Sequence, residues 1–202
     1  VAVIIATSIA AYMNYYVRAS QYDIWQQNPE IFALDDGTQL FTTTDAGYFI
    51  GLAQSIKRDG NFQTFNEKRL YPTNINSMQI ASPPASIFDA PLISSLIAFV
   101  ADGYSSKALL KAAHWLIPVT AAVTALFIVF AFGSVGYWLE GALAAAGGGL
   151  SLAYMARSGA GRIDTDQLNL GFFYLMFGLV IFAARAKSLR TSLALAVLAG
   201  AV

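Results

Sequence analysis

The sequence contains no cysteine, only one histidine and few charged residues. The absence of cysteine excludes a disulfide framework, a zinc–thiolate site and a thiol nucleophile. A single histidine excludes a metal site built from several imidazoles, and we expect this residue, His114, not to be catalytic. Charged residues make up 12% of the chain, against about 25% in an average globular protein. The net charge is zero, which argues against a nucleic-acid partner, because phosphate binding requires a basic patch or stripe.

Apolar residues dominate what remains. The 202 residues are 56% hydrophobic, with a mean hydropathy of +0.54. Together with the scarcity of charge, this composition predicts an integral membrane protein of the all-α class, a polytopic transmembrane helix bundle. We expect it in the plasma membrane of a prokaryote. The chain begins with Val1 in place of methionine and stops at Val202 inside an apolar run, so we expect it to be the N-terminal portion of a longer protein.

The apolar runs divide the chain into three parts. Residues 1–17 predict a first transmembrane helix, truncated at its start, since a spanning helix needs about 20 apolar residues. Residues 18–105 are polar and broken by Pro and Gly, which predicts a long extracytoplasmic loop with short helices. Residues 106–202 predict transmembrane helices two to five, the last one truncated. The second, third and fourth spans are expected at Ala112–Phe132, Trp138–Met155 and Leu168–Ala184.

Local patterns add detail to this layout. Arg185, Lys187 and Arg190 follow the fourth span and mark its end as cytoplasmic by the positive-inside rule, so that the long loop and the link before the fourth span lie outside. A short helix is expected at Ala46–Ser55, and the apolar segment Pro91–Val100 is too short to span and is expected to lie flat at the interface.

Charge concentrates in one polar loop between two apolar runs, Arg157–Asn169, with the sequence RSGAGRIDTDQLN. Asp164 and Asp166 stand where the fourth helix is expected to begin. One explanation is capping: Asp164 as N-cap and Gln167 three residues later have the form of a capping box, and an acid in the first turn suits the helix dipole. The other is binding, because carboxylate oxygens suit Mg²⁺ or Mn²⁺.

Two arginines and a distant aspartate belong with this loop. Arg157 and Arg162 lie on the side that the positive-inside rule disfavours, which is easier to understand if they meet an anionic group such as phosphate. Asp45 belongs to the first outer loop, where N-capping of the helix at Ala46 is the simpler explanation. If the fold brings Asp45 beside Asp164, the two carboxylates and the arginines could hold a metal ion and a phosphorylated group.

The segments TTTDAGYFIGLAQ, Thr42–Gln54, and RSGAGRIDTD, Arg157–Asp166, together with the order of spans and loops, resemble the catalytic subunit of asparagine-linked oligosaccharyltransferases. These enzymes belong to the membrane glycosyltransferases with the C-type fold. The resemblance covers nearly the whole chain in layout, but identity is limited to the two motifs.

The resemblance implies a metal-dependent, inverting transfer of an oligosaccharide from a polyprenyl-pyrophosphate carrier to the Asn of Asn-X-Ser/Thr in an acceptor polypeptide, at the extracytoplasmic face of the bilayer. It implies that Asp45 and Asp164 bind Mn²⁺ or Mg²⁺, with Asp166 supporting them as a third acid. It places Arg157 beside the carboxylates, whereas a phosphate-binding role for Arg162 rests on its charge alone.

Other functions stay open at this point. The family's later acidic ligand and its tryptophan-rich acceptor motif are not found before Val202, so we expect the chain to be inactive by itself. A related enzyme would move a sugar from a polyprenyl monophosphate, although such enzymes usually follow the early acid with a second one, and Asp45 is followed by Ala46. A membrane transporter or a non-catalytic assembly subunit is the alternative outside enzymes.

Overall fold

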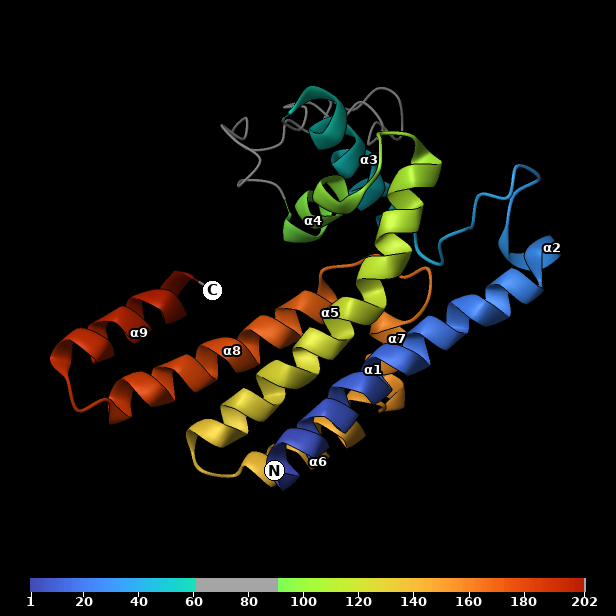
Figure 1. Cartoon of the computed structure of the whole chain (residues 1–202). Coiled ribbons are helices and arrows are strands. Elements are labelled where there is room, and N and C mark those ends of the chain that lie inside the picture. Colours follow the sequence, from blue (N-terminus) through green and yellow to red (C-terminus); the bar gives the residue numbers. More distant parts are fainter. Residues whose placement is uncertain (61–90, 202) are drawn as a thin grey trace.

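The computed structural model describes residues 1–60 and 91–201, and every regular element in these two ranges is a helix. The predicted all-α class is confirmed for this part of the chain. Figure 1 shows their arrangement. The helices are α1 (Ala2–Gln27), α2 (Pro29–Phe32), α3 (Thr44–Asp59), α4 (Leu92–Val100), α5 (Ser106–Ser134), α6 (Trp138–Gly149), α7 (Leu152–Ser158), α8 (Asp166–Arg185) and α9 (Leu189–Ala201).

The long helix α5 is the centre of the fold. It packs against α1, α6 and α8, and its first turns pack against α3 and α4, as Figure 1 shows. Ser105 begins the helix by accepting a hydrogen bond from the backbone N–H of Ala108 at 3.2 Å, the usual role of an N-cap serine. Most of its apolar and small residues are buried, so α5 serves as the common packing surface of the other helices.

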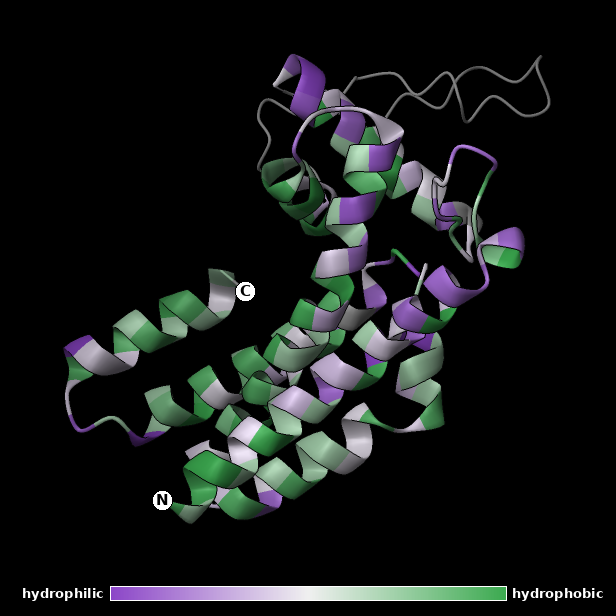
Figure 2. Ribbon diagram, turned by 45° about the vertical axis from the view of Figure 1, so that its right-hand side comes forward, coloured by the Kyte–Doolittle hydropathy of each residue, from purple (hydrophilic) through white to green (hydrophobic). Residues whose placement is uncertain are grey.

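Two described helices are long and apolar enough to cross a membrane, Ser106–Ser134 and the Leu168–Arg185 part of α8. Figure 2 shows hydrophobic residues along α5, α8 and α9, and hydrophilic residues gathered around α3 and the connecting segments near it. The sequence predicted five spans. Among the described residues α1 has the length but does not reach the same apolar character, and α9 has 13 residues.

The predicted third span is not one helix. The expectation of a continuous run over Trp138–Met155 is wrong, because α6 ends at Gly149 and α7 begins at Leu152 with Ser151 as its N-cap. Three consecutive glycines, 147–149, end α6, and glycine lowers helix stability by about 1 kcal/mol per residue relative to alanine. The chain therefore turns here, and α7 leads directly to the polar loop before α8 (Figure 1).

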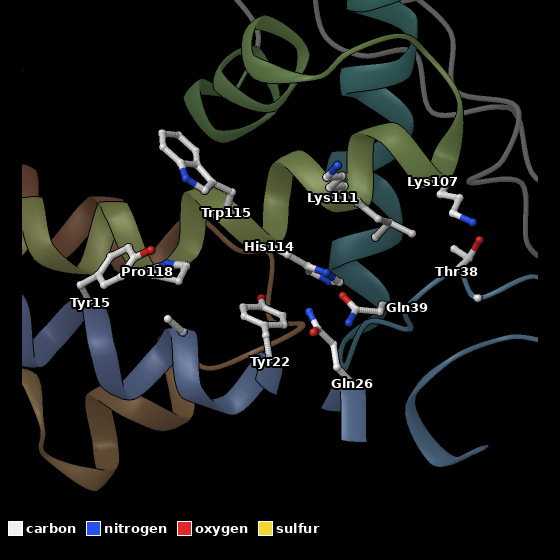
Figure 3. Close-up of a pocket in the computed structure, with 13 residues that line it drawn as sticks. Tyr15, Tyr22, Gln26, Thr38, Gln39, Lys107, Lys111, His114, Trp115 and Pro118 are labelled. Carbon is white, nitrogen blue, oxygen red and sulfur yellow. The ribbon is translucent and has the colours of Figure 1, made fainter. Parts of the chain in front are cut away.

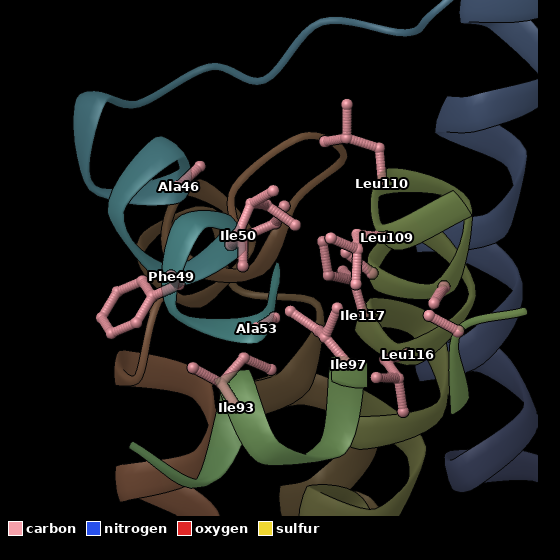
Figure 4. Packing of buried hydrophobic residues seen from close by; sticks show 14 of the residues in the cluster. Ala46, Phe49, Ile50, Ala53, Ile93, Ile97, Leu109, Leu110, Leu116 and Ile117 are labelled. Carbon is pink, nitrogen blue, oxygen red and sulfur yellow. The ribbon is translucent and has the colours of Figure 1, made fainter. Parts of the chain in front are cut away.

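A compact apolar cluster joins α3 and α4 to the start of α5, as Figure 4 shows. The structure confirms the predicted helix at Ala46–Ser55, which lies inside α3. The predicted apolar segment Pro91–Val100 contains α4, with Pro91 as the N-cap. The prediction that α4 lies flat at a membrane interface stays a prediction. Ile163, from the polar loop before α8, is fully buried in the same cluster. The core therefore fixes the start of α3 and the loop before α8 to one body.

Candidate functional site

The first motif begins α3. Thr43 is the N-cap, and its hydroxyl accepts a hydrogen bond from the backbone N–H of Ala46 at 3.3 Å. The prediction that Asp45 caps this helix is therefore wrong: Asp45 lies within the first turn, and it is exposed. The helix dipole favours a carboxylate at this position. Because Thr43 supplies the cap, the Asp45 carboxylate is not needed for capping and is available to a ligand.

The second motif forms the connection from α7 to α8. Helix α8 begins at Asp166 with Thr165 as N-cap, so the prediction of Asp164 as N-cap is wrong by one residue. The Asp164 carboxylate instead accepts a hydrogen bond from the Thr165 backbone N–H at 2.6 Å. This bond satisfies one of the backbone N–H groups that have no partner within the helix at its start. The Gln167 side chain, the other half of the predicted capping box, lies outside the described residues.

Each arginine of the loop pairs with an aspartate of the same loop. Arg157 Nη1 donates to Asp166 Oδ2 at 3.1 Å, with side chains 60% and 41% exposed. Arg162 lies 3.7 Å from Asp164, with side chains 24% and 15% exposed, and its Nε is buried with no hydrogen-bond partner among the described residues. The inner pair is thus better shielded from water than the outer pair, and its guanidinium has donor capacity left for a ligand.

A backbone hydrogen bond joins the two motifs. The N–H of Thr42, the first residue of one motif, donates to the carbonyl oxygen of Gly161, in the other, at 3.0 Å. The two residues are more than a hundred positions apart in the chain, so this contact depends on the fold. It places the segment leading to Asp45 directly beside the segment leading to Asp164.

Helix α1 holds the loop in place from the other side. The N–H of Gly161 donates to the hydroxyl oxygen of Tyr22 at 3.0 Å, and the N–H of Ala160 donates to Gln21 Oε1 at 2.7 Å. Burial raises the pKa of the Tyr22 hydroxyl, which stays neutral. Gly161 has φ +69°, and a side chain there would lie 2.3 Å from the ring of Trp25, so only glycine fits this close approach.

The three predicted metal ligands do not form a ready-made three-ligand site. No group of three or more histidine, cysteine, aspartate or glutamate side chains with metal-binding geometry occurs in the part of the chain that the structure describes. Asp164 and Asp166 face arginines of their own loop instead. The donor chemistry fits a site of one or two carboxylates completed by water and substrate phosphates, which is how Mg²⁺ is commonly bound.

Sequence reasoning missed Arg18, which it assigned to the polar outer loop. The side chain is fully buried and donates to Ser158 Oγ at 2.7 and 3.0 Å and to the carbonyl oxygen of Gly149 at 2.9 Å. Its guanidinium also lies 4.9 Å from the centre of the Tyr154 ring. Ser158 is the last residue of α7, so Arg18 fixes the end from which Arg157 and the polar loop project.

The sequence contained one indication that Arg18 is buried: a second polar residue, Asn14, one helical turn earlier on α1. Asn14 is fully buried, and its side-chain amide donates to the carbonyl oxygens of Ala10 and Ala145. Positions i and i+4 share one helix face, so Asn14 and Arg18 form a buried polar stripe on α1. Polar and charged groups inside such helices usually face the bundle interior.

No family model matches this chain, and no curated protein matches it.

Proposed function

We propose that this chain is part of a polytopic membrane glycosyltransferase that transfers an oligosaccharide from a polyprenyl pyrophosphate to the side-chain amide of Asn in Asn-X-Ser/Thr. The observation that carries the proposal is the hydrogen bond from Thr42 to Gly161 at 3.0 Å, which joins the two motifs. The motifs resemble those of asparagine-linked oligosaccharyltransferases, in which the same two segments supply acids to one site.

In this reaction the amide nitrogen of the acceptor attacks the anomeric carbon, the bond from that carbon to the pyrophosphate oxygen breaks, and the polyprenyl pyrophosphate leaves with the bonding electron pair. The nitrogen then loses a proton to water. Asp45, exposed in the first turn of α3, accepts hydrogen bonds from the amide N–H groups and so orients the weak nucleophile. Asp164 lies in the neighbouring segment, and Asp166 supports it as the second acid of the pair.

The arginines of the loop bind the leaving group. Arg157 is the more exposed of the two and can exchange Asp166 for a pyrophosphate oxygen at small cost, since an exposed ion pair contributes about 1 kcal/mol or less. Arg162 retains a buried, unpartnered Nε, and arginine recognises phosphate through paired donors. A bound Mn²⁺ or Mg²⁺ would offset the charge that grows on the pyrophosphate, with Asp45 and Asp164 as its ligands.

Manganese binding tests the site. We expect Asp45→Asn and Asp164→Asn to lower the affinity of the chain for Mn²⁺, measured by electron paramagnetic resonance of free Mn²⁺, by about tenfold or more, the usual loss when a metal site is disturbed. Asp102→Asn is the matched control, because Asp102 is an exposed aspartate outside the two motifs and its removal changes net charge equally. Equal binding by all four proteins contradicts the shared site.

Sugar transfer tests the reaction itself. A longer protein that contains this chain is assayed with a polyprenyl-pyrophosphate oligosaccharide and an Asn-X-Thr peptide. We expect Asp45→Asn and Asp164→Asn each to abolish transfer, with Asp102→Asn active. Transfer that survives both substitutions overturns the enzyme assignment and favours a transporter or an assembly subunit.

A further inference from the structure

A second polar site lies in a cavity of 480 Å³ between α1, α5 and the segment at residues 37–39. Tyr22 separates it from the second motif, because its ring lines the cavity and its hydroxyl accepts a hydrogen bond from Gly161. Figure 3 shows its walls: α5 contributes Lys107, Lys111, His114 and Trp115, and α1 contributes Tyr15 and Tyr22. Among the residues that the structure describes, no aspartate or glutamate lines the cavity. Its groups are therefore cationic or neutral at one end and aromatic at the other.

The two lysines are in an arrangement that the helix by itself disfavours. Lys107 and Lys111 are four residues apart on α5, where like charges repel, and both lie near the N-terminus of the helix, where the dipole opposes a cation. Lys107 donates to the carbonyl oxygen of Asp36 at 3.1 Å. Lys111 is exposed and pairs with no carboxylate of the described residues. An anion between the two lysines would relieve this repulsion.

A neighbouring acid, Asp36, attracts Lys107 electrostatically, but its carboxylate is hydrogen-bonded within its own turn. Asp36 Oδ1 accepts a hydrogen bond from the backbone N–H of Thr38 at 2.8 Å, and hydrogen bonds from Thr38 hold the pKa of Asp36 below its usual range. The Asp36 carboxylate is thus used by its own turn, and it is not among the cavity-lining residues. The turn places Gln39 opposite α5 in the cavity wall, as Figure 3 shows.

His114 supplies an unused polar atom to the same cavity. It is 8% exposed, its ring lies 4.4 Å from that of Tyr22, and its Nε2 is buried without a hydrogen-bond partner among the described residues. A buried polar atom without a partner is unfavourable, because it has lost its hydrogen bonds to water. His114 follows Lys111 by three residues and so lies on the same face of α5. Its Nε2 can bond to the anion that the lysines attract.

The other end of the cavity suits an apolar chain. Trp115 is 53% exposed, and Trp115, Tyr15 and Pro118 are among the residues that line the cavity. Tryptophan and tyrosine concentrate at the level of lipid headgroups in membrane proteins. Since α5 is one of the helices long and apolar enough to cross a membrane, a ligand with a charged head and an apolar tail matches the cavity better than a small soluble anion.

We propose that this cavity binds the phosphate headgroup of an acidic membrane phospholipid, with Lys107, Lys111 and His114 around the phosphate and the acyl chains along Trp115. These binding groups are not part of the proposed catalytic site, so the site stands or fails separately from glycan transfer. It anchors the end of α5 that carries α3 and α4.

Competition between lipids tests this site. The chain is reconstituted in detergent micelles with equimolar phosphatidylglycerol and phosphatidylcholine, and retained lipids are counted by native mass spectrometry. We expect phosphatidylglycerol to be retained preferentially. Lys111→Gln should weaken its binding about fivefold, the loss expected when one basic residue near an acidic lipid is removed. Lys57→Gln, which removes an equal exposed charge from the end of α3, should leave binding unchanged.

A second measurement locates the lipid. Phosphatidylglycerol brominated on its acyl chains should quench the tryptophan fluorescence of the protein. Trp115→Phe should remove most of that quenching, whereas Trp138→Phe, on α6, should not. Equal retention of the two lipids, or equal effects of Lys111→Gln and Lys57→Gln, overturns the site. If inorganic phosphate alone displaces the lipid at equal concentration, the ligand is a free anion and the lipid proposal fails.

Discussion

The arginines of this protein occupy two contrasting environments. Arg18 is fully buried and held by a hydroxyl, backbone carbonyls and the side-chain oxygen of Asn14. Arg157 and Arg162 pair with carboxylates of the loop before α8, the Arg157 pair at the surface and the Arg162 pair partly shielded from water. Among the described residues no carboxylate pairs with Arg18. The buried arginine thus joins three helices, whereas the exposed Arg157 has a partner within its own loop.

Burial explains why the hydrogen bonds of Arg18 and the ion pair of Arg157 contribute differently to the free energy of unfolding. A charge removed from water needs most of its donors satisfied, because unpaired polar groups in the interior are costly. Arg18 meets this need with acceptors from α1, α6 and α7 at once. The exposed pair of Arg157 and Asp166 exchanges readily with water. Substitutions at the two places should therefore differ in effect on stability and on binding.

The largest effect is expected at Arg18. Arg18→Met should lower the free energy of unfolding by about 3 kcal/mol, because Ser158 and Gly149 lose a buried hydrogen-bond donor. Arg18→Lys keeps the charge but loses the planar fork and should recover only part of the loss. Denaturant titration in detergent, followed by circular dichroism, measures both. A loss below about 1 kcal/mol for Arg18→Met would show that the buried network adds little.

The next effect concerns the end of α6 that Arg18 contacts. A Cβ at Gly149 would lie 2.0 Å from Asn14 Oδ1, whereas one at Gly147 meets nothing within 4 Å. We expect Gly149→Ala to destabilise the fold by about 2 kcal/mol through overpacking. Gly147→Ala should stabilise it by about 0.5–1 kcal/mol through the helix propensity of alanine. Thermal unfolding of the two variants measures the difference, and equal shifts would contradict the close contact of α1 with α6.

A smaller effect separates the two residues that begin α3. Thr43→Ala should cost about 1 kcal/mol, because it removes the side-chain cap. Asp45→Ala should cost about 0.5 kcal/mol or less, since it removes only a favourable charge near the helix dipole. Unfolding of both variants in denaturant gives the comparison. A larger loss of stability for Asp45→Ala than for Thr43→Ala would show that Asp45, and not Thr43, caps the helix.

The smallest effect is expected at the exposed pair. Arg157→Gln should change the free energy of unfolding by less than about 1 kcal/mol, because the partners are 60% and 41% exposed. Added salt should reduce even this contribution, since exposed charges are screened. Chemical denaturation at low and high salt measures it. A loss as large as that of Arg18→Met would remove the distinction between the two arginine environments.

Much of the helical layout could be predicted from residue order. The long apolar runs that form α5 and α8, and the polar start of α3, follow from composition and local turn signals. The break between α6 and α7 was missed, although Gly147–Gly149 marked it, because small residues also favour close packing of continuous helices. The caps were predicted one or two residues away from where they form, which is the usual uncertainty of helix boundaries.

Residue order indicated the two motifs of the candidate site but not the contacts between them. The motifs around Asp45 and Asp164 could be recognised separately, yet their adjacency depends on a hydrogen bond between Thr42 and Gly161. The ion pair between Arg157 and Asp166 likewise depends on the path of the chain from α7 through the loop to α8. Neither follows from spacing along the chain, since each requires segments to meet in space.

The sequence by itself determined that the protein is helical, poor in charge and built around long apolar segments, because helix propensity and hydrophobic runs are local properties. Only the tertiary structure decided that Arg18 is buried while Arg157 is exposed. The reason is physical: the partners of Arg18, Gly149 and Ser158, lie 131 and 140 positions away, and a hydrogen bond over that separation exists only after the helices have packed.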